Sequence, residues 1–166
     1  VEAPVIMLIS ASTALVTGNN SYRKLKKFTD ILNALITTFH LIILIPPVFN
    51  FIVIRLMGVP EEVAKLAYIA LVIFLPWAAS IGYRRFYQGI LIRNNLTRRV
   101  TYGTLIRLLV IVVVGLFLYF TGVKGAYVGA GAMSLAVLVE AIVTKMMVSR
   151  SLRNLLQKED TVNRDM

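Results

Sequence analysis

The sequence predicts an all-α protein, a polytopic bundle of about five transmembrane helices. Of its 166 residues, 58% are hydrophobic and only 16% are charged; soluble domains average about half apolar and about a quarter charged. The apolar runs approach or exceed the roughly 20 residues that cross a bilayer, and are too long and uniform for barrel strands. With barrel strands excluded, only helices can satisfy the backbone hydrogen-bonding groups within the lipid bilayer. We expect a bundle over residues 1–148, with spans at 3–17, 31–57, 63–92, 100–121 and 123–148, and a cytoplasmic tail at 149–166.

The basic residues predict an orientation in the membrane rather than nucleic-acid binding, although the formal net charge is +10. They lie mainly between the apolar runs. In chain order, the four connections and the C-terminal segment hold 4, 1, 5, 1 and 4 lysines and arginines. Cytoplasmic segments carry the excess of Lys and Arg. We therefore expect a multi-pass protein of the cell membrane with a cytoplasmic C-terminus and Val1 on the outer side.

The first apolar run, residues 3–17, is short for a span and begins almost at the first residue. No basic segment precedes it, so it does not look like a signal peptide. With Val1 expected outside, this favours the C-terminal part of a longer protein with an odd number of helices upstream. The alternative is a complete small protein whose first helix is short.

Prolines predict kinks in the second and third runs. Pro46 and Pro47 lie near the middle of residues 31–57, and Pro76 lies within residues 63–92. Proline removes a backbone donor and clashes with the preceding turn, so helices bend there. Broken helices line substrate sites in transporters, but an ordinary kink packed against neighbouring helices explains the prolines equally well.

The third run is too long for one straight span. We expect it to leave the hydrocarbon near Gly82 and to continue as a cytoplasmic extension. Arg84, Arg85 and Arg93 are then basic residues of the cytoplasmic side. Such arginines set the topology first, and they could also attract anionic substrates or lipid head groups.

Ionisable residues inside the spans are the candidate functional side chains, because charge is costly in hydrocarbon. Arg107 and Glu140 each lie about seven or eight residues from the cytoplasmic ends of the last two spans, roughly 10–12 Å deep at about 1.5 Å per residue. A short turn joins these spans, so they are antiparallel neighbours and the two side chains should pair. The pair either couples or gates transport, or is a static ion pair that fixes helix register.

His40 lies at a similar depth in the second span. An intramembrane histidine can relay protons. The more common role is a hydrogen bond to a neighbouring helix, and the sequence leaves both open.

No catalytic constellation is visible, so we do not expect an enzyme. There is no HExxH, P-loop or GxSxG motif, and the chain has one His and eight acidic residues. The absence of cysteine excludes thiol chemistry and Cys-based metal sites. We expect no cofactor and no metal.

The last two spans resemble the last two helices of the progressive ankylosis transporters, through residues 106–109, 119–129 and 139–141. These transporters belong to the multidrug/oligosaccharidyl-lipid/polysaccharide (MOP) flippase superfamily, with the multidrug-and-toxin extrusion transporters. The pattern includes an Arg at Arg107 and a Glu at Glu140. Residues 86–91 followed by Arg93 are similar to the superfamily's motif between two spans, but Asn94 stands where drug exporters often carry Gly.

The resemblance implies a fold of two six-helix bundles around a central cavity. This chain would be the second bundle without its first helix, and the partner would be an N-terminal bundle of the same or another chain. The implied function is export of a small anionic or lipid-linked solute by alternating access. The alternative is a small multi-pass protein with a structural or assembly role in the bilayer and no transport of its own.

Overall fold

The computed structural model describes residues 3–17 and 19–162, with side chains from residue 5 to residue 149 apart from Gly18. The expectations for Val1 and for residues 163–166 fall outside this part. The described secondary structure is entirely helical. Its elements are α1 (Ala3–Leu15), α2 (Asn19–Ile43), α3 (Pro46–Asn50), the π-helix η1 (Phe51–Leu56), α4 (Glu61–Ile73), α5 (Leu75–Arg93), α6 (Thr97–Phe120) and α7 (Gly125–Val162).

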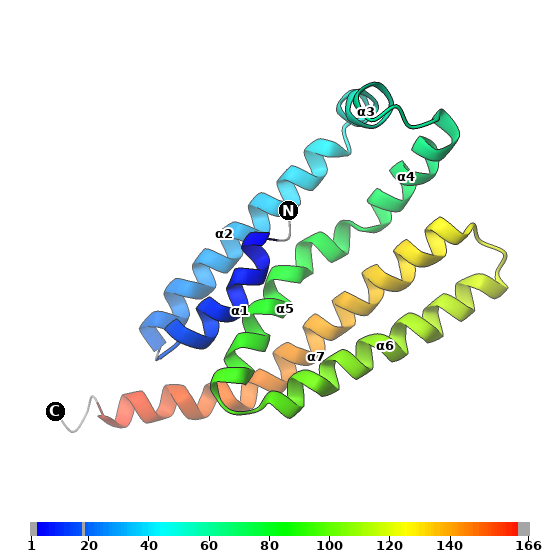
Figure 1. Ribbon diagram of the computed structural model, residues 1–166. Helices are drawn as coiled ribbons and strands as arrows, with labels where there is room; N and C mark the ends of the chain where they lie inside the picture. The colour runs from blue at the N-terminus through cyan, green and yellow to red at the C-terminus, as the bar shows by residue number, and fades with distance from the viewer. Residues whose placement is uncertain (1–2, 18, 163–166) are drawn as a thin grey trace.

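Helix α5 is the centre of the bundle. It packs against α1 and α2 on one side and against α7 on the other, and α6 returns antiparallel beside α7 (Figure 1). The best-buried apolar side chains lie on it: Phe86, Ile90 and Leu91 are fully enclosed. They pack with Val16 beyond α1 and with Val148 of α7, so one end of the bundle closes around α5.

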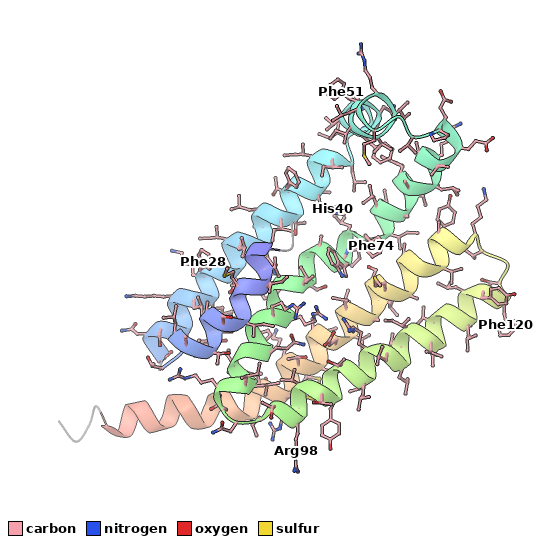
Figure 2. The ribbon with its side chains drawn as sticks, viewed as in Figure 1. Phe28, His40, Phe51, Phe74, Arg98 and Phe120 are labelled. Carbon is pink, nitrogen blue, oxygen red and sulfur yellow. The ribbon has the colours of Figure 1, made fainter. Side chains whose placement is uncertain are left out.

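Two helices are long and apolar enough to cross a membrane without interruption. They are α6 and the Gly125–Ser149 part of α7, with mean hydropathies of 2.4 and 1.9. Only 6% of the apolar window of α6 is buried inside the bundle. Large apolar side chains are exposed along the helix from Leu105 to Phe120, and Arg98 lies near its other end (Figure 2). Such a surface suits a lipid bilayer.

Two further candidate spans are broken helices, which makes two to four candidates where the sequence predicts about five. Asn19–Ile43 and Pro46–Leu56 meet at 75°, and α4 and α5 meet at 46°. The remaining expected span, residues 3–17, is the shorter apolar helix α1 of 13 residues. At about 1.5 Å per residue it is about 20 Å long, less than the roughly 30 Å of a hydrocarbon core.

Both breaks lie where prolines predict kinks. Pro46 and Pro47 form the first turn of α3 after an extended Ile45, and Pro76 lies in the first turn of α5. Proline is tolerated in a first turn because the N–H it lacks has no helical acceptor there. The residue before a proline avoids helical backbone, which ends α2 ahead of Pro46.

Helix α2 begins earlier than the sequence suggests. Arg23, Lys24, Lys26 and Lys27, expected in a connection, lie within its first turns. The helix extends over them because its other face packs on the core: Tyr22 stacks on Phe86 with ring centroids 5.7 Å apart. At the other end of the chain, α7 continues through Val162 over most of the expected tail.

The segment after Gly82 is the packed interior of the bundle rather than an extension beyond it. Gly82 donates its backbone N–H to Oδ1 of Asn33 on α2, and Nδ2 of Asn33 donates to the carbonyl of Ala79. About two turns further along α5, Gly89 packs against Ser12 of α1, and a Cβ at Gly89 would lie 2.6 Å from the backbone oxygen of Ile9. These close approaches seat α1 and α2 on α5.

Candidate functional site

Glu140 of α7 is the centre of a buried polar cluster. Its exposed fraction is 0%, while Arg84 and Gln88 of α5 are each 5% exposed. Arg84 donates from Nη1 to Oε2 of Glu140 at 2.8 Å, and Gln88 donates from Nε2 to Oε1 at 3.1 Å. Both carboxylate oxygens of Glu140 thus have a side-chain donor on α5.

The two donors reach Glu140 together because of helix geometry. Arg84 and Gln88 are four residues apart on α5, so their side chains lie on one face, one turn apart. That face is turned toward α7, which packs along α5. We expected Arg84 on the cytoplasmic side of the chain, and sequence reasoning missed it as a partner of Glu140.

Arg107 of α6 completes the cluster, which we call the Glu140 cluster: Arg84, Gln88, Arg107 and Glu140. The pair that the sequence predicts is present but loose, with Nε of Arg107 3.7 Å from Oε2 of Glu140. The Arg107 side chain is 30% exposed, and its Nε has no hydrogen-bond partner. Glu140 is therefore shared unequally between two arginines that come from different helices.

Gly103 of α6 lies beside the cluster, one turn from Arg107. A Cβ at this position would lie 3.8 Å from Cγ of Glu140 and 3.4 Å from Oγ1 of Thr144, which are ordinary contact distances. The α6 backbone therefore passes close to α7 here. Two buried polar residues, Glu140 and Thr144, thus line the contact between α6 and α7.

The charges of the cluster do not cancel. Two guanidinium groups face one carboxylate, and Nε of Arg84 also lacks a hydrogen-bond partner. Unbalanced charge is expensive in a low-dielectric interior. The arrangement can therefore exchange the partners of Glu140 or attract an anion to the partly exposed Arg107.

His40 serves a different contact. Its Nε2 lies 2.9 Å from the carbonyl oxygen of Leu71, in the last turn of α4 just before the break at Phe74. In Figure 2 its label lies between α2 and the α4–α5 segment. The hydrogen bond to a neighbouring helix, one of the two roles that the sequence leaves open, is the one seen.

The other basic candidates are not part of the cluster. Arg93 donates from Nη1 to the carbonyls of Thr13 and Ala14 at 2.8 and 3.0 Å. These carbonyls lie in the last turn of α1, where they have no helical donor and where a cation is favoured by the helix dipole. Arg85 of α5 is partly exposed. Among the described side chains, those of residues 5–17 and 19–149, no three His, Cys, Asp or Glu gather as metal ligands would.

Comparison of the chain with protein-family models, with curated proteins and with solved structures gives no match. The coarse description is that of an all-α protein with helices of transmembrane length.

Proposed function

We propose that this chain is part of a membrane transporter of the MOP flippase type, which exports a small anionic or lipid-linked solute by alternating access. The observation that carries the proposal is the fully buried Glu140 shared between Arg84 and Arg107. Ionisable residues inside membrane helices are rare and mark substrate or ion pathways. The resemblance of residues 106–141 to the progressive ankylosis transporters points the same way.

The sharing of Glu140 between two arginines favours a cluster that rearranges during transport over an ion pair that only holds helices together. Arg84 and Gln88 already supply a donor to each oxygen of Glu140, so a brace does not need Arg107. A second, looser arginine gives the carboxylate another partner when α6 shifts against α5. In the proposed cycle Glu140 passes from Arg84 toward Arg107, and Arg107 meets the anionic solute when it is released.

The helix breaks supply places for such a movement. α4 and α5 meet at 46° and the α2–α3 junction turns by 75°, and a transporter needs points where packed helices can bend. A second bundle, from the same or another chain, would face this one across the solute path.

The competing function is a structural or assembly role in the membrane. The complete pairing of the Glu140 carboxylate favours it, because a satisfied buried ion pair can serve only to fix how helices pack. Under this alternative the cluster holds α5, α6 and α7 together and moves nothing.

The test is uptake of labelled pyrophosphate and citrate by everted membrane vesicles that contain the full-length protein. We expect uptake above that of empty vesicles. We expect Glu140→Gln to abolish uptake per amount of folded protein, since loss of the buried pair also lowers stability. The matched control is Glu61→Gln, an exposed acidic residue in the first turn of α4, which should transport normally. No uptake by the wild-type protein, or unchanged uptake by Glu140→Gln, would overturn the proposal. Loss of folded protein in step with uptake would support the structural role.

A further inference from the structure

A second polar feature lies outside the Glu140 cluster. It is a groove of about 520 Å³, floored by α5 and walled by α2 and α7. None of the four residues of the Glu140 cluster lines it. We call it the α2–α7 groove and define it by Lys26 and Asp30 of α2, Tyr83 and Tyr87 of α5, and Ile142 and Lys145 of α7.

The groove changes character along its length. On α7 it runs from Leu138 to Lys145, and on α5 it runs from Pro76 to Tyr87. At about 1.5 Å per residue these stretches are roughly 10 and 16 Å long. The two lysines and the two tyrosines lie toward one end, while apolar side chains such as Leu138 and Ile142 continue toward the other. A ligand with an anionic head and an apolar tail matches this gradient.

The charge at the basic end is available to a ligand. Lys26 and Lys145 come from opposite walls, and no ion pair within 4.0 Å in the described part of the chain uses either of them. Asp30 is the one acidic residue of the lining, beside two lysines. The lining therefore carries two cations and one anion.

We propose that the α2–α7 groove binds a phosphate-bearing amphiphile. The phosphate lies between Lys26 and Lys145, within reach of the Tyr87 hydroxyl, and the tail follows the apolar wall past Ile142. Lysine binds phosphate as a point charge, and basic residues near an anionic head group attract it. Binding does not depend on transport. Only the view that this ligand is the transported solute rests on the proposed function.

Native mass spectrometry of the full chain in a neutral detergent tests the site. The probes are dioleoyl phosphatidic acid and dioleoylglycerol, which differ only in the phosphate. We expect phosphatidic acid to bind and dioleoylglycerol not to bind. Replacing both lysines, Lys26→Gln with Lys145→Gln, should weaken the binding of phosphatidic acid about tenfold or more, by the loss of two such contacts. The matched control is Lys24→Gln with Lys27→Gln, which removes the same charge from exposed positions of α2 and should change binding less than twofold.

Three results would overturn the proposal. Equal binding of dioleoylglycerol would remove the phosphate requirement, and an equal loss in the control pair would show general surface attraction. Displacement by free glycerol 3-phosphate at the same concentration as phosphatidic acid would show that the tail adds nothing. If the double variant fails to fold, the single variant Lys145→Gln, at an exposed position, gives the same comparison. Glu140→Gln should still bind phosphatidic acid, so a failure of transport and a failure of this site are distinguishable.

Discussion

The carboxylate of Glu140 and the guanidinium of Arg84 lie 2.8 Å apart in the interior of the bundle, although 56 residues separate them in the chain. The contact ties α7 to α5. Because α5 also carries the contacts to α1 and α2, the pair links the two sides of the bundle. Removing this pair should therefore weaken helix packing well beyond α7.

Arg84→Met should lower the stability of the folded protein strongly. Removing one partner of a buried pair costs about 3–5 kcal/mol, because the other charge is left uncompensated. Gln88 and Arg107 still face Glu140, so we expect the lower end of that range. Thermal unfolding in detergent measures the effect. The double variant Arg84→Met with Glu140→Met should recover much of the loss, and a double variant as unstable as the sum of two single variants would contradict this account.

Arg107→Met should be far milder than Arg84→Met. Its Nε is 3.7 Å from Oε2 of Glu140. Without Arg107, both carboxylate oxygens still have a donor, from Arg84 and Gln88. The same unfolding assay checks it. A charge exchange, Arg107→Glu with Glu140→Arg, should not restore the fold, because the new cation would face Arg84. A stable exchanged variant would mean that Arg107, not Arg84, is the main partner.

Gly89→Ala should loosen α1 from α5. The added Cβ would meet the Ser12 side chain and the Ile9 backbone oxygen, and a backbone cannot give way as a side-chain end can. Overpacking of this kind costs about 1–3 kcal/mol. Gly129→Ala on α7 is the control, since nothing lies within 4 Å of its Cβ position; it should be neutral or stabilise by roughly 0.5–1 kcal/mol through helix propensity. Equal unfolding temperatures for the two variants would refute the close contact.

Arg93→Gln should increase hydrogen exchange in the last turn of α1. The arginine holds the Thr13 and Ala14 carbonyls, and charged hydrogen bonds of this kind are worth about 1.5–3 kcal/mol each. Exchange mass spectrometry over residues 8–17 measures the change. Arg98→Gln removes the same charge from an exposed position that points away from the bundle (Figure 2), and protection of α1 should be unaffected there.

The helical class, the two proline breaks and the α6–α7 hairpin follow from local features of the sequence. Long apolar runs and the positions of Pro46 and Pro76 are sufficient, because a span length and a missing N–H act within a few residues. Residues 3–17 were expected as a fifth span, and the structure has a shorter apolar helix there. The start of α2 was misplaced because basic side chains were read as a loop, whereas on one face of a helix they are compatible with a packed opposite face.

The candidate site was predicted only in part. Arg107 and Glu140 could be paired because a short turn makes their helices neighbours. The pairing of Arg84 with Glu140 could not be predicted, because no local feature of α5 indicates which helix packs against the polar face of α5. One signal was present: Arg84 and Gln88 lie one turn apart within a stretch otherwise rich in buried apolar residues. Polar residues at that spacing on a buried helix need a buried partner.

The packing of α1 on α5 also has a consequence for synthesis, because α1 is made well before α5. Thr13 and Arg93, which meet at the end of α1, are 80 residues apart. At about 5–20 residues per second, a ribosome needs roughly 4–16 s to make that stretch. For that time α1 has none of its contacts with α5. Until α5 emerges, the face of α1 that packs on α5 must be covered by lipid, by the translocation machinery or by a chaperone.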